Sequence, residues 1–136
     1  MAKKILIVDD DTLFREMLSE VLKSAGYETL LAKDGVHGLS TFKESRPDLI
    51  VTDIRMPRKN GIEMSIEILR ASPQTPIIFV SGWYNRERLY AEGRDYASFL
   101  KNETFRPRFL KKPFHVTQLL NMIQEILVPG ESHQAA

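Results

Sequence analysis

The sequence contains no cysteine, and this absence excludes disulfide bonds and thiol chemistry. It also lacks a long apolar run near its N-terminus, where four apolar residues precede the first aspartate, too few for a signal-peptide core or a membrane span. Neither sign of charge dominates: the formal net charge is +1, so bulk charge gives no attraction to nucleic acids or membranes. We therefore expect a soluble, cytoplasmic protein that binds neither nucleic acid nor membrane.

Nucleotide-binding motifs and histidine metal sites are missing too. No Walker loop and no Gly-x-Gly-x-x-Gly pattern occurs, which leaves nucleotide binding with little support. The three histidines, His37, His115 and His133, lack the spacing of a metal site and are expected on the surface. With 136 residues, 43% of them hydrophobic, the chain suits one globular domain. We expect that domain over residues 1–128 and a flexible tail over 129–136.

What the sequence does contain is a regular alternation of strand-length apolar runs and segments with helical periodicity. Five runs predict strands, at residues 5–8, 27–32, 49–52, 77–80 and 109–111. Apolar residues at helical spacing predict helices around residues 14–25, 36–42, 62–69 and 116–126. Because alternating strands and helices form right-handed crossovers, we expect a doubly wound α/β fold with a mostly parallel five-stranded sheet covered on both faces.

Polar side chains follow four of the predicted strands. They are Asp9, Asp10 and Asp11 after the first, Asp53 after the third, Ser81 after the fourth and Lys112 after the fifth. Ligands of parallel sheets bind outside the carboxyl ends of the strands, so these side chains are expected at one edge. Taken singly, each also fits a simpler role, the aspartates as helix caps, the serine in a turn and the lysine in solvent.

Their joint placement points to phosphoryl-transfer chemistry. Three consecutive aspartates repel one another by roughly 4 kcal/mol per close pair at an effective dielectric constant of about 20. A divalent cation would remove that repulsion, and Mg²⁺ takes oxygen ligands, usually one or two carboxylates with water and phosphate. Acids, a hydroxyl and an ammonium at one edge are what magnesium-assisted phosphoryl transfer onto a carboxylate requires.

Four motifs carry a family resemblance. "ILIVDDD", "VTDIRMPRKNG", "IIFVSG" and "FLKKPF", in this order within residues 4–128, resemble the receiver domain of bacterial two-component response regulators, single-domain chemotaxis-regulator-like members in particular. The resemblance implies a flavodoxin-like fold with strand order 2-1-3-4-5. It also implies phosphorelay signalling: the domain takes a phosphoryl group from a sensor histidine kinase or phosphotransfer protein. Such a domain is not an enzyme, although it assists its own phosphorylation and slow dephosphorylation.

The resemblance assigns roles to the acidic residues. Asp53 resembles the phosphoacceptor, which attacks the phosphorus of a phosphohistidine. Asp9 and Asp10 resemble the acidic pair that holds Mg²⁺, together with Asp53 and the backbone carbonyl of Arg55. Asp11 is then left as the cap of the first helix.

The same resemblance covers the later motifs. Ser81 and Lys112 resemble the hydroxyl and the ammonium that bind phosphoryl oxygens, and a cis Lys112–Pro113 bond is expected to aim the lysine inward. Phe109 occupies the place of the switch aromatic, with a plain core phenylalanine as the alternative. Phosphorylation then draws the loops of Ser81 and Lys112 inward. A downstream protein would read this change through the face formed by the fourth helix, the fifth strand and the fifth helix.

Two residues are expected to control hydrolysis of the phosphorylated state. By resemblance, Arg55 and Trp83, two positions beyond Asp53 and Ser81, flank the approach of the attacking water. A guanidinium and a bulky indole would obstruct that water, which predicts slow autodephosphorylation; the alternative is that both point to solvent. The chain departs from the family pattern nearby, because the segment between Ser81 and Lys112 is lengthened and is expected to form a longer fourth helix with an added basic loop.

Two other function classes are alternatives to a receiver domain. A haloacid-dehalogenase-type phosphatase also uses an Asp nucleophile, but its Asp-x-Asp-x-Thr motif is out of step with Asp9 to Thr12, and no acidic pair follows the fourth strand. A phosphorylation-independent receiver-like scaffold would not need every position of the site filled. The short tail and the closeness of Met1 to the first strand predict a single-domain regulator, monomeric or weakly dimeric, with a receiver cut from a longer chain as the alternative.

Overall fold

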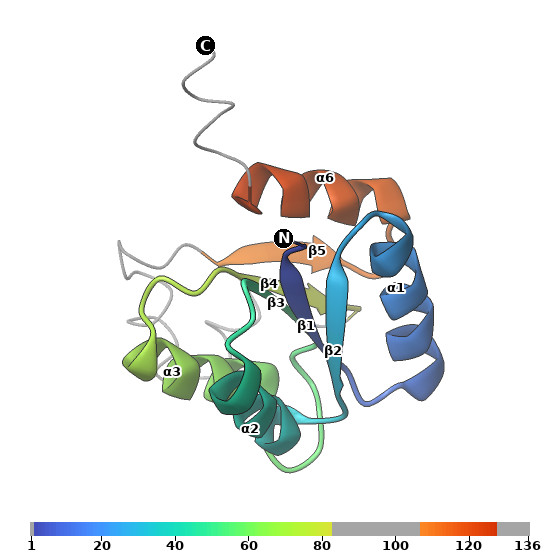
Figure 1. Cartoon of the computed structure of the whole chain (residues 1–136). Helices are drawn as coiled ribbons and strands as arrows, with labels where there is room; N and C mark the ends of the chain where they lie inside the picture. The colour runs from blue at the N-terminus through green and yellow to red at the C-terminus, as the bar shows by residue number, and fades with distance from the viewer. Residues whose placement is uncertain (1, 83–106, 128–136) are drawn as a thin grey trace.

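The structure, a computed structural model, describes residues 2–82 and 107–127. Five strands form one sheet in the order β2-β1-β3-β4-β5, and every neighbouring pair is parallel (Figure 1). The strands are β1 (Lys4–Val8), β2 (Glu28–Ala32), β3 (Leu49–Thr52), β4 (Ile77–Ser81) and β5 (Arg108–Lys111). The predicted fold class and strand order are confirmed, with strand ends that differ from the predicted ones by one residue at most.

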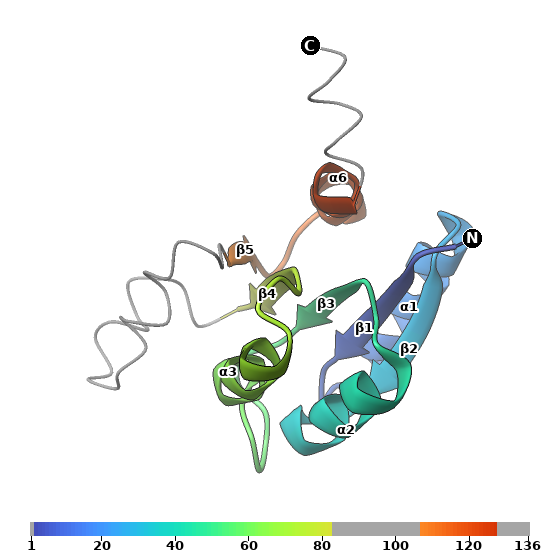
Figure 2. The same cartoon turned by 60° about the vertical axis from the view of Figure 1, so that its left-hand side comes forward.

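Helices cover both faces of this sheet (Figure 2). They are α1 (Thr12–Ser24), α2 (Gly35–Ser45), α3 (Gly61–Ala71) and α6 (Val116–Leu127). Alternate residues of β1 serve the two faces: Leu6 and Val8 pack in the core beneath α2 and α3, whereas Ile5 and Ile7 pack with residues of α1 and α6. All four side chains are fully buried, which is why a parallel strand appears in the sequence as an unbroken apolar run.

Side-chain caps set where the helices begin. Asp11 precedes α1 and accepts a hydrogen bond from the backbone N–H of Phe14 at 3.2 Å, as predicted for the last residue of the acidic run. Asp34 caps α2 in the same way, and Asn60 caps α3 in a reciprocal capping box with Glu63. These caps fix the path of the loops that enter each helix.

Several sequence-based expectations fall outside the described residues. The tail over 129–136 and most of the lengthened segment, including Trp83 and the expected fourth helix, belong to this group. Within residues 2–82 and 107–127, no helix has the length and apolar character needed to cross a membrane.

The loop between β3 and α3 is held close to its neighbours at both ends. Gly61 N–H donates to the carbonyl oxygen of Ile54 at 2.9 Å, and a Cβ atom on Gly61 would lie only 2.1 Å from the carbonyl oxygen of Asp53. At the loop's far side, Gly35 N–H donates to the carbonyl of Lys59 at 3.1 Å. The Arg58 guanidinium adds a hydrogen bond of 3.0 Å to the buried Asp34 carboxylate. The backbone that carries Asp53 therefore has little room to shift.

Replacing Gly61 by Ala should lower the free energy of unfolding by about 3 kcal/mol, the upper end of typical overpacking costs, because the new methyl meets rigid backbone rather than a mobile side chain. Gly82→Ala is the matched control, since among the residues that the structure describes the nearest atom to its Cβ would be 3.8 Å away, an ordinary contact. Chemical denaturation of both variants measures the difference. Equal stability of the two would contradict the close approach.

Candidate functional site

The site begins at the seam between β1 and β3, where the strand order reverses. Val8 and Thr52 are register partners, so the next residue of each strand, Asp9 and Asp53, leaves the sheet side by side. Asp53 N–H donates to the carbonyl of Val8 at 2.9 Å, which extends the ladder by one bond. Ligands of doubly wound sheets bind at such a reversal point. Carboxylate oxygens of Asp9, Asp10 and Asp53 all lie within 4.8 Å of one another.

Asp9 is the buried member of this acidic group, with 1% of its surface exposed. Its Oδ1 accepts a hydrogen bond of 2.9 Å from the backbone N–H of Asp11, and its own N–H donates to Ala32 at 3.1 Å. The Arg15 guanidinium donates to its carbonyl oxygen at 2.6 Å. Main chain and α1 thus fix Asp9 and leave its Oδ2 directed at the site, whereas Asp10 is exposed to solvent.

Asp53 presents one oxygen to the backbone and the other to a lysine. Its Oδ1 accepts from the N–H of Ile54 at 2.7 Å, while Oδ2 accepts from Lys112 Nζ at 3.3 Å. The Thr52 hydroxyl donates to its carbonyl oxygen at 2.8 Å. The side chain is 14% exposed, so it can be approached from solvent.

Lys112 bridges the two strands. Its ammonium donates to Asp9 Oδ2 at 3.0 Å and to Asp53 Oδ2 at 3.3 Å. The Lys112–Pro113 bond is cis, as predicted, and the lysine N–H donates to the carbonyl of Ser81 at 3.0 Å. Ser81, at the end of β4, is buried at the same edge. The side chains expected at this edge, those of Asp9, Asp10, Asp53, Ser81 and Lys112, therefore lie together.

Burial and charge act against each other in the ionisation of this site. Burial, together with the Asp9 carboxylate, raises the pKa of Asp53 above its ordinary value, although the ammonium of Lys112 opposes the shift. Burial alone would lower the pKa of Lys112, but the two carboxylates outweigh it and raise that pKa. The lysine is therefore firmly charged at neutral pH, while ionisation of Asp53 is disfavoured.

This donor set fits Mg²⁺. All three clustered side chains offer carboxylate oxygens, the ligand type of hard cations, and no thiolate or imidazole belongs to the group. Burial, and to a smaller extent the Asp9 carboxylate, raises the pKa of Asp53, and the Lys112 ammonium does not fully offset this. A divalent cation would supply further positive charge.

The remaining sequence-predicted residues lie around this centre. Phe109 on β5 is half-buried, with its ring centroid 5.3 Å from that of Phe79, and it packs against the core beneath α2 and α3. Arg55 is exposed in the β3–α3 loop. Trp83 lies outside the described residues, so the predicted role of Arg55 and Trp83 in flanking the approach of the attacking water stays a prediction.

Sequence reasoning missed one contact of the site. Apolar periodicity places Phe14 on the apolar face of the helix predicted around residues 14–25, but in the structure the Lys112 ammonium lies over its ring, with Nζ 4.1 Å from the ring centroid. The available signal was its position in the first turn of the helix that follows the aspartates. Helical periodicity gives a face for such a residue and does not give its partner across the loop.

Comparison with known proteins identifies the family. A sequence model of the response regulator receiver domain matches residues 5–124. The chain belongs to this family. Receiver domains act in two-component phosphorelay signalling, are typically non-enzymatic, and bind Mg²⁺ at an acidic cluster of the kind formed here by Asp9, Asp10 and Asp53.

Individual relatives agree with this assignment. The transcriptional regulatory protein CpxR of Escherichia coli is 35% identical over 124 residues, 91% of this chain and 49% of that protein. The DNA-binding response regulator MtrA of Mycobacterium tuberculosis is 40% identical over 81 residues, 60% of this chain and 35% of that protein. This chain therefore matches half or less of the length of these curated relatives.

Solved structures match along nearly the whole chain. Chemotaxis protein CheY4 of Vibrio cholerae superposes with a TM-score of 0.78 at 31% identity, covering 93% of this chain and 100% of that one. A CheY-like receiver domain protein of Methanospirillum hungatei gives a TM-score of 0.81 at 28% identity, covering 98% and 99%. The receiver fold predicted from the motifs is confirmed.

Replacing Asp53 by Asn should stabilise the metal-free domain at neutral pH. The pKa of Asp53 is higher in the folded than in the unfolded state, so the folded state binds the extra proton and loses stability as pH rises from the unfolded value through the folded one. The Asn variant escapes this loss, so its advantage should be small at low pH and grow across that window. Thermal unfolding with a chelator measures it; an advantage independent of pH would contradict the shift.

Proposed function

We propose that Asp53 accepts a phosphoryl group from the phosphohistidine of a sensor histidine kinase or phosphotransfer protein, and that the modified domain then changes its binding to a downstream protein. The observation that carries this proposal is the position of the Asp53 carboxylate, 14% exposed at the reversal point of the sheet, within hydrogen-bond distance of an ammonium and beside two further carboxylates. Family membership supports it.

The proposed transfer is a displacement at phosphorus. An oxygen of Asp53 forms a bond to phosphorus as the bond from phosphorus to the donor histidine breaks, and the electron pair of that bond stays on the imidazole nitrogen. Mg²⁺, held by Asp9, Asp10, Asp53 and the backbone carbonyl of Arg55, would neutralise charge on the phosphoryl oxygens. Lys112, which now donates to both carboxylates, would donate to one of those oxygens instead.

Two groups of this chain would couple the modification to a change of shape. The Ser81 hydroxyl and the Lys112 ammonium are proposed to bind phosphoryl oxygens, and their strands are already joined by the bond from Lys112 N–H to the Ser81 carbonyl. Charge-assisted hydrogen bonds contribute roughly 1.5–3 kcal/mol each, so two give about 3–6 kcal/mol. Moving a two-state equilibrium from 1:99 to 99:1 takes roughly 5.5 kcal/mol. The free energy of the two hydrogen bonds is therefore comparable with that needed to switch the domain.

The readout is proposed to run through β5 and its neighbours. Phe109, half-buried beside Phe79, is the proposed switch aromatic, and a downstream protein would bind the face of the fourth helix, β5 and α6. Arg55, together with Trp83, is proposed to slow hydrolysis by obstructing the attacking water. We further propose that the domain comprises residues 1–128, that it is cytoplasmic, and that it is monomeric or weakly dimeric.

Acetyl phosphate with Mg²⁺ should add one phosphoryl group to the wild type and none to Asp53→Asn, as measured by intact mass. Asp11→Asn is the matched control: it makes the same change two residues from Asp9 at a helix cap, where Asn serves equally well, and should be modified like the wild type. A modified Asp53→Asn would contradict the proposal. Multiple turnover of a phosphate ester would instead favour the haloacid-dehalogenase-type phosphatase. A wild type that takes no phosphoryl group but still binds its partner would favour the phosphorylation-independent scaffold.

Asp10→Asn should weaken Mg²⁺ binding by about tenfold or more, because affinity at such sites depends on the number of carboxylate charges. The same change should raise the stability of the metal-free domain, since it relieves repulsion with Asp9 and Asp53. Titration calorimetry and thermal unfolding measure the two effects, with Asp11→Asn again as control. Unchanged affinity together with unchanged stability would reduce the acidic pair to a helix cap.

A further inference from the structure

The Lys112 ammonium has a third neighbour besides its two carboxylates. Its Nζ lies 4.1 Å from the centroid of the Phe14 ring, well inside the range of a cation–π interaction. An ammonium has three N–H donors, and Asp9 and Asp53 account for two of them. The ring face of Phe14 occupies the remaining side.

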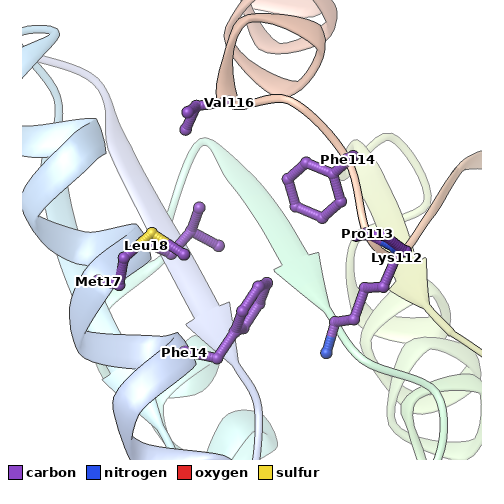
Figure 3. A pocket seen from close by; sticks show the side chains of 7 residues that line it. All are labelled: Phe14, Met17, Leu18, Lys112, Pro113, Phe114 and Val116. Carbon is purple, nitrogen blue, oxygen red and sulfur yellow. The ribbon is translucent and has the colours of Figure 1, made fainter.

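The Phe14 ring is itself fixed in place. It meets the Phe114 ring edge to face, with centroids 6.1 Å apart and planes at 89°. Both rings line an apolar cavity of about 490 Å³ between α1 and the β5–α6 loop (Figure 3). In that view the Lys112 side chain, which also lines the cavity, runs from the loop toward Phe14. The ring belongs to α1, an element separate from the β5–α6 loop that carries the lysine.

We propose that Phe14 is a positioning residue for Lys112: its ring face keeps the ammonium at the edge of the acidic cluster when the carboxylates take other partners. This inference rests on the proposed phosphorylation of Asp53. A lysine side chain is long and flexible, so it needs a fixed partner to stay in one place. Both carboxylates change their partners if a cation or a phosphoryl group arrives, whereas an uncharged ring does not.

An aliphatic residue could not do the same. Leucine at position 14 would fill much of the same space against Phe114 but would offer the ammonium no attraction. The charged end would then gain by turning to solvent, because an ammonium beside a purely apolar surface loses hydration without compensation. Tyrosine would keep the ring face.

The contact is tested first without metal or phosphate. The Cε protons of Lys112 should show an upfield ring-current shift by NMR in the wild type and in Phe14→Tyr, and lose it in Phe14→Leu. Phe14→Leu and Lys112→Met should also be coupled in thermal unfolding, with the combined effect differing from the sum of the single ones. An unshifted wild type, or strictly additive effects, would overturn the inference.

The second test is the rate of phosphorylation by acetyl phosphate at saturating Mg²⁺. Phe14→Leu should be slower by about fivefold, with Mg²⁺ affinity unchanged, and Phe14→Tyr should match the wild type. Met17→Ala, which shortens another side chain lining the same cavity, is the packing control and should keep the wild-type rate. A wild type left unmodified would overturn the proposed function, whereas a wild type modified no faster than Phe14→Leu, or an equal loss in Met17→Ala, would overturn the positioning role alone.

Discussion

One ammonium shared between two carboxylates is the interaction on which this site depends. Asp9 and Asp53 leave neighbouring strands side by side because β1 and β3 are paired in register, so the fold itself forces their charges together. Lys112 reaches both from the loop that follows β5. Even with this ammonium nearby, burial and the neighbouring Asp9 carboxylate disfavour the ionised form of Asp53. The site therefore favours the arrival of further positive charge.

The surrounding backbone keeps the carboxylates of Asp9 and Asp53 close together despite their repulsion. Mobile acidic residues would move apart, but Asp9 is held by three hydrogen bonds through its main chain and Oδ1. Asp53 is followed by a loop whose return at Gly61 leaves no room for a Cβ atom. Rigid supports of this kind preserve a cluster of like charges that would otherwise relax, which is the property a cation-binding site needs.

The fold could be predicted from the sequence because its signals are local. Apolar runs such as Ile5–Val8 mark strands buried on both faces, and Asp11 marks a helix start, without knowledge of distant contacts. The acidic cluster followed from one topological rule about strand ends. The Phe14–Lys112 contact did not, since it joins residues 98 positions apart across a loop whose path no periodic pattern encodes. The packing of Phe109 against the core and against Phe79 also could not be predicted, because it depends on contacts between different strands.

Lys112 contacts several separate elements of the fold. Its ammonium contacts β1 through Asp9, the loop after β3 through Asp53, and α1 through the Phe14 ring, while its backbone is bonded to the end of β4. A change of charge at Asp53 alters the balance among these contacts at once. Packed elements shift between discrete arrangements rather than deform smoothly, so the proposed phosphorylation of Asp53, by redirecting this one ammonium, would act on α1 and on the end of β4 together.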